Sequence, residues 1–161
     1  MKTALNADPS RLDAAEKNVV DQVRTHGWFA TYVATDEVGP DFSYTTGFWL
    51  KFQVPELIVF SLPQEVAHQI CWNFYNALEA GERFSKGAPI EGVINNYTVY
   101  LIDVLKEHYP EFLGWNRWFY GGDTFEVQQL IWPNAAHSFP WSPEADADLK
   151  SSQPSLSERR W

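Results

Sequence analysis

The stretch that decides the fold runs from Trp28 to Phe48. It reads Trp28-Phe29-Ala30-Thr31-Tyr32-Val33-Ala34-Thr35, then Asp36-Glu37-Val38-Gly39-Pro40-Asp41, then Phe42-Ser43-Tyr44-Thr45-Thr46-Gly47-Phe48. The two outer parts are rich in aromatic and β-branched residues, which favours strands. The central part is polar and contains Gly39 and Pro40, as turn connections do. Two strands joined by a short connection run antiparallel, so the stretch predicts a hairpin within an antiparallel or mixed sheet.

Further elements follow from the same reasoning on both sides of the hairpin. Three more strands are predicted, at Leu57–Ser61, Tyr97–Leu105 and Glu126–Trp132, for about five in all. Apolar residues at helical spacing predict one helix from the cap at Asp8-Pro9-Ser10 to His26-Gly27, and a second from Pro63 to Gly81. The span His108–Tyr120 predicts a short helix and a loop. We expect an α+β fold with these two main helices packed on one face of the sheet.

The length of 161 residues is that of one domain. We expect a single domain over residues 1–142, followed by a polar tail, residues 143–161, that is flexible because it contains few apolar side chains. The single cysteine, Cys71, cannot form an internal disulfide, and the N-terminus has no apolar stretch of the kind found in signal peptides. The sequence therefore predicts a cytoplasmic protein.

The charge is concentrated in the body of the chain. Of the formal net charge of −9, residues 27–142 contribute most, with thirteen acidic and five basic side chains. An acidic body repels phosphate groups, which excludes nucleic acid and anionic membranes as expected partners. The same charge suits a basic protein partner.

Motifs for chemistry are few. Glu65, His68 and Cys71 are spaced by three residues on one predicted helix, but a carboxylate–histidine metal site needs matching pairs from other helices. Cys71 lies between Ile70 and Trp72, where a thiol is usually a small buried apolar group. Phosphate-binding glycine loops do not occur in the sequence. We expect no metal and no cofactor, and assign no catalytic residue.

An aromatic stretch, Trp115-Asn116-Arg117-Trp118-Phe119-Tyr120-Gly121-Gly122-Asp123, is the strongest local candidate for a binding site. An arginine among aromatic rings is a common recognition device. A dense run of rings also packs the wall of a core, and both interpretations stand. His108, in a polar and aromatic turn, is a candidate for acid–base work. The terminal Arg159-Arg160-Trp161 is a candidate contact for a partner or a neighbouring copy.

Eight segments occur in an order that carries a family resemblance. They are Gly27-Trp28, Phe42–Gly47, Pro55-Glu56-Leu57, Gly81-Glu82-Arg83-Phe84, His108–Gly114, Trp118–Gly122, Gln129–Pro133 and Phe139-Pro140-Trp141. Over about residues 20–142 the chain resembles the bacterial domain-of-unknown-function family 4262. The resemblance implies a bacterial cytosolic protein and carries no activity.

The polar and amphipathic residues in or beside those segments form a candidate ligand-binding pocket. They are Tyr44, Thr45, His108, Tyr109, Arg117, Tyr120 and Gln129. Small size, acidity and high aromatic content favour a non-enzymatic binding protein for a macromolecular partner, of the immunity or antitoxin kind. The alternative is a small-molecule-binding protein or an enzyme of unfamiliar type, with an aromatic pocket around His108 and Tyr120.

Overall fold

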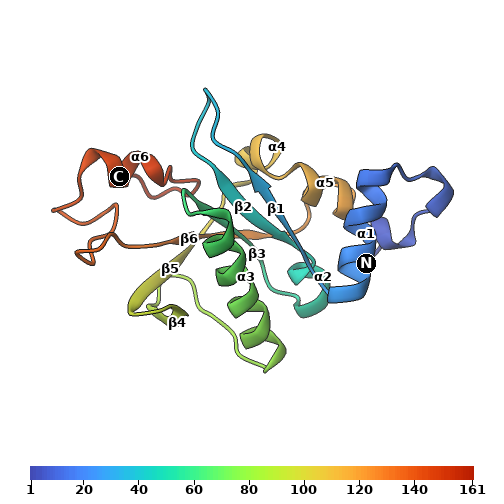
Figure 1. Cartoon of the computed structure of the whole chain (residues 1–161), viewed down its shortest axis with the longest axis horizontal. Helices are drawn as coiled ribbons and strands as arrows, with labels where there is room; N and C mark the ends of the chain where they lie inside the picture. The colour runs from blue at the N-terminus through green and yellow to red at the C-terminus, as the bar shows by residue number, and fades with distance from the viewer.

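One mixed sheet of six strands forms the centre of the molecule (Figure 1), in the order β1-β2-β3-β6-β5-β4. The computed structural model describes all of residues 1–161. The strands are β1 (Phe29–Val33), β2 (Phe42–Thr46), β3 (Glu56–Phe60), β4 (Ile90–Ile94), β5 (Tyr97–Asp103) and β6 (Val127–Ile131). β3 and β6 are parallel, and every other neighbouring pair is antiparallel. The α+β class is confirmed.

The expected count of about five strands is corrected to six, because β4 was not predicted. Its sequence, Ile90-Glu91-Gly92-Val93-Ile94, places a glycine in the strand interior, which weakens any strand pattern. Gly92 has a φ of 83°, and the pairing with β5 shifts register between Ile90 and Ile94. A bulge of this kind breaks the alternation by which strands are recognised.

Six α-helices form, where the sequence predicted two main helices and one short helix followed by a loop within His108–Tyr120. They are α1 (Ala14–His26), α2 (Phe48–Phe52), α3 (Gln64–Glu79), α4 (Tyr109–Phe112), α5 (Gly114–Tyr120) and α6 (Ala147–Ser152), with single 3₁₀ turns η1 (Ala4–Asn6), η2 (Pro9–Arg11) and η3 (Lys106–His108). None of them is both long enough and apolar enough to cross a bilayer.

The first helix starts later than its sequence suggested. Asp8 caps only the turn η2, whereas α1 begins after Asp13, whose side chain accepts from the Glu16 N–H at 2.8 Å. The Glu16 carboxylate accepts in return from the Asp13 N–H at 2.9 Å, which completes a capping box. The predicted end is confirmed: α1 stops at Gly27, which has a left-handed φ of 87°.

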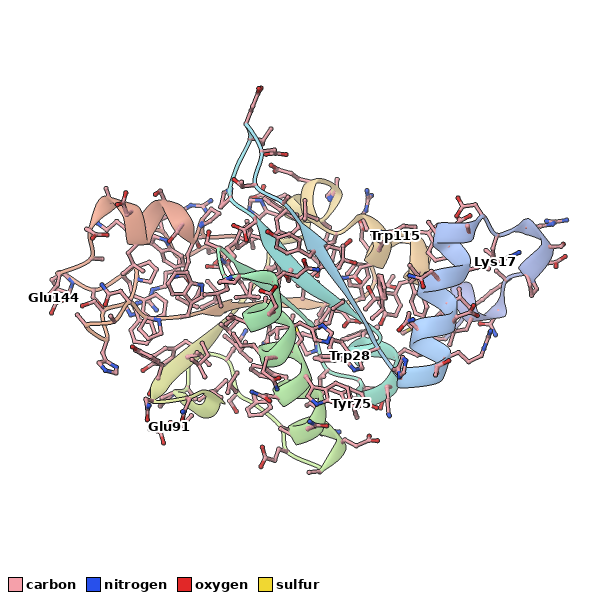
Figure 2. The ribbon with its side chains drawn as sticks, in the orientation of Figure 1. Lys17, Trp28, Tyr75, Glu91, Trp115 and Glu144 are labelled. Atoms are coloured by element: carbon pink, nitrogen blue, oxygen red, sulfur yellow. The ribbon has the colours of Figure 1, made fainter.

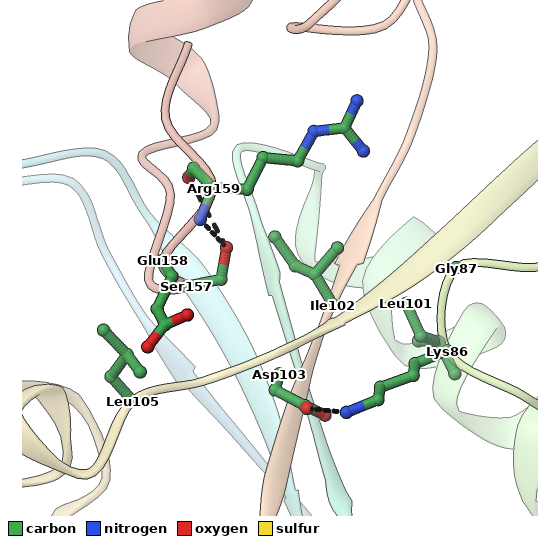
Figure 3. Close-up of a pocket in the computed structure, with 9 residues that line it drawn as sticks. All are labelled: Lys86, Gly87, Leu101, Ile102, Asp103, Leu105, Ser157, Glu158 and Arg159. Carbon is green, nitrogen blue, oxygen red and sulfur yellow. Dashed lines mark hydrogen bonds and ion pairs between the residues drawn. The ribbon is translucent and has the colours of Figure 1, made fainter.

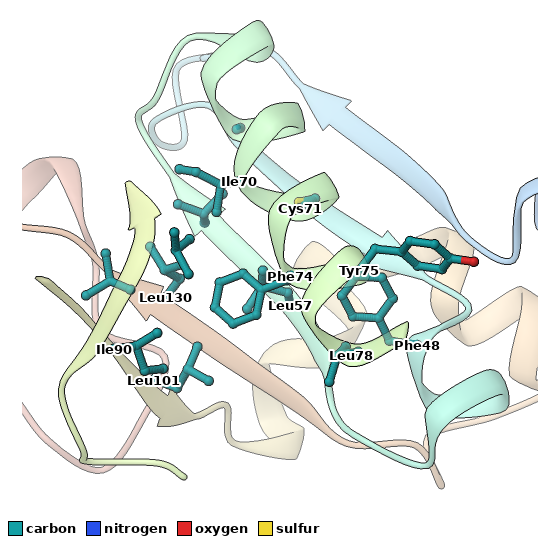
Figure 4. Close-up of a cluster of buried hydrophobic side chains, with 14 of the residues drawn as sticks. Phe48, Leu57, Ile70, Cys71, Phe74, Tyr75, Leu78, Ile90, Leu101 and Leu130 are labelled. Carbon is teal, nitrogen blue, oxygen red and sulfur yellow. The ribbon is translucent and has the colours of Figure 1, made fainter. Parts of the chain in front are cut away.

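Helices cover both faces of the sheet, and the expectation of one covered face is corrected. In front, α3 lies over Leu57 and Val59 of β3 (Figure 4), with Ile70, Phe74 and Leu78 among the buried side chains. Behind, Ile58 and Phe60 pack against side chains of α1, α4 and α5. Each residue of Leu57–Phe60 is apolar, so both sides of β3 must be shielded from water.

The polar tail, expected to be flexible, is packed against the body. Leu149 and Leu156 are buried, and Gln153 is fully buried with its side chain bonded to both backbone polar groups of Trp132. The terminal Trp161 donates from its indole to the Gln153 carbonyl at 2.8 Å. The polar side chains of the tail thus find hydrogen-bond partners, which a count of apolar residues does not reveal.

Gly47 has the closest surroundings of any glycine in the chain. It links β2 to α2 with a φ of 122°, and a side-chain Cβ added there would lie 2.6 Å from the Gly27 carbonyl oxygen and 3.0 Å from the Trp28 Cα. Both contacts are to backbone, which cannot move aside without displacing the start of β1. Only glycine fits this position.

Replacing Gly47 with alanine should therefore lower the free energy of unfolding by about 2–4 kcal/mol, because strained φ and backbone overlap add together. Urea unfolding measures the change. Gly87→Ala is the matched control: its φ of 74° is also positive, but a Cβ there meets nothing within 4 Å, so the loss should stay near 1 kcal/mol. Equal losses in the two variants would contradict the close contact.

Candidate functional site

A buried carboxylate joins the hairpin to the helices. Glu56, the first residue of β3, is fully buried, and its two oxygens accept five hydrogen bonds. Oε1 accepts from the Thr45 hydroxyl at 2.8 Å and the Phe48 N–H at 3.1 Å. Oε2 accepts from the Tyr120 hydroxyl and from the N–H groups of Gly47 at 2.8 Å and Trp49 at 3.2 Å. We call this group the Glu56 clamp.

The direction of each hydrogen bond in the clamp is fixed by its surroundings. The Thr45 oxygen accepts from the Leu57 N–H at 3.0 Å, so the Thr45 proton points to Glu56. The Tyr120 oxygen accepts from the N–H groups of Gly47 and Leu50, so its proton also points to Glu56. All five neighbours are donors, and such a site stabilises a carboxylate rather than a carboxylic acid.

Two opposing effects act on the acidity of this group. Burial raises the pKa of Glu56, while hydrogen bonds from Tyr120, Thr45 and the N–H groups of Gly47 and Trp49 lower it. The positive N-terminal end of α2, which begins at Phe48, adds to the stabilisation of the anion. The pKa of Tyr120 is raised, by burial and by the negative charge of Glu56. Burial is the larger effect, so the pKa of Glu56 lies above its usual range, and the clamp holds a neutral phenol beside a carboxyl group that is surrounded by donors.

The seven residues of the expected pocket do not share one cavity. The hydroxyls of Thr45 and Tyr120 both donate to Glu56 and are therefore part of the clamp. Tyr44 is buried, and its hydroxyl accepts from the Trp115 N–H at 3.1 Å. These three residues hold elements of the fold together.

The other four residues of that set lie apart. Tyr109 stacks on Phe125 and donates to its carbonyl at 3.1 Å. Gln129 is fully buried and binds the tail. Its Nε2 donates to the Pro154 carbonyl at 2.8 Å, and its Oε1 accepts from the Leu156 N–H at 3.0 Å. Arg117 pairs with Asp123, its Nε lying 2.7 Å from Oδ1. His108 Nε2 is 3.7 Å from a Glu107 carboxylate oxygen and has no hydrogen bond.

The residues considered as metal ligands also face different ways. Cys71 is fully buried in the front core, and burial raises the pKa of its thiol to about 12, so it stays protonated at neutral pH. His68 is exposed on the same helix. No three side chains of the kinds that bind metals gather at any point of the chain.

One surface cavity, of about 430 Å³, lies between β5 and the end of the chain (Figure 3). Its charged side chains include Lys86, Asp103, Glu158 and Arg159, and Lys86 forms an ion pair with Asp103 across the cavity floor. The Ser157 hydroxyl accepts from the Arg159 N–H at 3.0 Å. With acids and bases in equal number, this cavity has no marked preference for the sign of a ligand.

A second cavity, of about 350 Å³, runs along the outer side of β1 and is aromatic. It is lined by Gln22, His26, Trp28, Phe29, Ala30, His68 and Trp72, and we call it the aromatic groove. The Trp28 ring stacks on His68 and Tyr75, with centroid distances of 5.4 and 5.9 Å. Figure 2 shows Trp28 and Tyr75 side by side near one end of α3. Trp72, stacked on Tyr75, is 41% exposed, a large fraction for a tryptophan.

The strand beside the groove is an open edge of the sheet. β1 pairs only with β2, and its sequence Phe29-Ala30-Thr31-Tyr32-Val33 contains no charge and no proline. Proteins usually protect such edges with lysine, proline or a bulge. Tyr32, at the far end of the strand, has its pKa raised by partial burial and by the negative charges of Asp41 and Glu65. The edge thus combines free backbone groups, rings and acidic neighbours.

Comparison with known proteins gives one result. The sequence profile of the family described as Domain of unknown function (DUF4262) matches residues 22–146. The chain belongs to this family. No curated protein and no solved structure matches the chain.

Three residues of these sites were missed by sequence reasoning. Glu56 is a charged residue directly before the wholly apolar run Leu57–Phe60, which is a signal for a buried, paired carboxylate. Trp72 lies off the apolar stripe of α3, which is a signal for an exposed ring. Trp28 follows the glycine that ends α1, and nothing in the sequence around it marks it as a site residue. Glu56 and Trp28 both lie within residues 22–146, the range that the family profile matches.

Glu56→Gln tests the clamp, because the amide introduces N–H donors where five donors already point. We expect it to lower the free energy of unfolding by about 2–4 kcal/mol, the cost of leaving buried donors unpaired. Chemical denaturation at pH 7 is the measurement. Glu91→Gln, at an exposed position of β4, is the control and should change stability by less than about 0.5 kcal/mol. An unchanged free energy of unfolding in Glu56→Gln would mean that the native carboxyl group is already uncharged.

Proposed function

We propose that the chain is a non-enzymatic binding protein for a macromolecular partner, of the immunity or antitoxin kind, and that it binds a basic protein segment along β1. The proposal rests on one observation: the exposed Trp72 and the rings stacked behind it border an unprotected edge strand. A cytosolic location in a bacterial cell accompanies the proposal, supported by the single reduced Cys71.

The edge strand suits an extended segment of the partner. A peptide that adds to an open edge gains main-chain hydrogen bonds, and its alternate side chains enter pockets beside the strand. The aromatic groove lies where such side chains would reach, next to Phe29 and Ala30. Trp72 then serves as an anchor of the type that dominates binding energy at interfaces.

Charge supports a basic partner in particular. Asp41 and Glu65 lie close enough to the Tyr32 hydroxyl to raise its pKa. The hairpin tip carries Asp36 and Glu37, both exposed. The excess of eight acidic over basic side chains in residues 27–142 would speed the approach of a positively charged partner and make binding weaker at high salt.

Site-specific photo-crosslinking in the cell that produces the chain tests the proposal. With the reactive amino acid at Gln22, inside the groove, we expect one adduct with a protein of net positive charge. With it at Glu144, on the opposite side of the molecule (Figure 2), we expect none. Adding Trp72→Ala to the Gln22 probe should reduce the adduct at least about tenfold, as loss of an interface anchor does.

Val66→Ala is the matched control for that substitution. Val66 is on the same helix and 42% exposed, but it does not line the groove. The adduct should keep its yield in this variant. Absence of any adduct at Gln22, equal adducts at the two probe positions, or equal effects of Trp72→Ala and Val66→Ala would each overturn the proposal.

A further inference from the structure

A small apolar cavity opens on the other flank of α3, away from the aromatic groove. Its volume is about 210 Å³, and its floor and wall are formed by Leu57, Phe74, Leu78 and Phe84. Figure 4 shows Leu57, Phe74 and Leu78 gathered between α3 and the sheet. The exposed side chains of Gln53 and Arg83 stand at its rim. An apolar interior with a few polar groups at the opening is typical of a small-molecule site.

Arg83 is the charged group at the opening of this cavity. Of the five basic side chains in residues 27–142, Lys51, Lys86 and Arg117 form ion pairs, and Lys106 donates to the carbonyls of Asp123 and Phe125. Arg83 has no carboxylate partner, although acids outnumber bases in this part of the chain. Its positive charge is therefore available.

The guanidinium is also held in place. Its Nη1 donates to the carbonyls of Leu78 and Glu82, at 3.2 and 2.6 Å, and the group lies 5.7 Å from the ring centroid of Phe52. Nε and Nη2 make no hydrogen bond within the chain. A guanidinium fixed through one nitrogen, with two donors free, is preorganised to bind an oxyanion through a pair of hydrogen bonds.

We propose that this cavity binds a small monocarboxylate with a short apolar tail. The carboxylate pairs with Nε and Nη2 of Arg83, and the tail enters the space above Leu57 and Phe74. An apolar cavity of about 150 Å³ holds a benzene molecule, so 210 Å³ accommodates a tail of about six to eight carbon atoms with the carboxylate at the mouth. No covalent step is involved.

The lining of this cavity overlaps two segments that carry the family resemblance. The segments Pro55-Glu56-Leu57 and Gly81-Glu82-Arg83-Phe84 are two of the eight that carry the resemblance, and between them they supply Pro55, Leu57, Arg83 and Phe84 to the lining. Glu56 itself faces the clamp, whereas its two neighbours face this cavity. The binding site thus lies within the part of the chain that the family shares, residues 22–146.

Isothermal titration of the full chain with octanoate and with 1-octanol tests the proposal. Octanoate should bind, and Arg83→Met, which keeps an unbranched apolar stem and removes the guanidinium, should weaken that binding at least about tenfold, as loss of charge-assisted hydrogen bonds does. Octanol, which has the same tail and no charge, should bind the parent and the Arg83→Met variant alike. Arg117→Met removes a guanidinium that pairs with Asp123 instead, and it should leave octanoate binding unchanged.

Absence of octanoate binding at millimolar concentration, or equal octanoate affinity in Arg83→Met and the parent, would overturn the proposal. This result is separable from the proposed protein-binding function. Trp72→Ala, which acts on the aromatic groove, should leave the octanoate affinity unchanged, because Trp72 does not line this cavity. Failure of one site therefore does not imply failure of the other.

Discussion

The carboxylate of Glu56 is the constraint on which the rest of the structure depends. It binds three consecutive N–H groups, those of Gly47, Phe48 and Trp49, and so fixes the turn from β2 into α2. The same oxygens hold Tyr120 at the end of α5 and Thr45 on β2. One buried charge thereby joins β2 and the start of α2 to α5. Removing the carboxylate would leave five buried donors without their acceptor, which is costly.

The clamp also decides where the aromatic groove lies. Gly47, held by Glu56, is in backbone contact with Gly27 and Trp28. Since Gly27 ends α1 and Trp28 precedes β1, this contact sets the position of the edge strand relative to α3. Trp28 then stacks between α3 side chains and forms the inner wall of the groove. A structural interaction inside the molecule thus shapes its most exposed aromatic surface.

Much of the fold could be predicted from local sequence, and particular residues show which elements could not. The Trp28–Phe48 stretch predicted β1 and β2 because its aromatic and β-branched runs and its turn residues agree there. β4 was missed because Gly92 and its bulge remove the pattern. The packed tail was missed because it is held by amide hydrogen bonds of Gln129 and Gln153, which depend on partners far away in sequence.

The candidate sites were harder to predict for the same reason. Tyr120 and Thr45 were expected to line a ligand pocket, whereas in the structure both bind Glu56, which was not among the expected site residues. Arg83 was visible as part of a family segment, whereas its lack of a carboxylate partner is a property of the folded surface. The sequence identifies the residue types, but only the folded structure shows which of these side chains lie together.

The most direct test of this account is the charge state of Glu56 in the folded chain. Carbon-13 NMR of the Glu56 side-chain carboxyl, followed during acidification from pH 7, measures it. We expect the chemical shift of an ionised carboxylate at pH 7, with protonation at a pH above the ordinary glutamate range because burial raises the pKa. The chemical shift of a carboxylic acid at pH 7 would contradict the clamp as the centre of the structure.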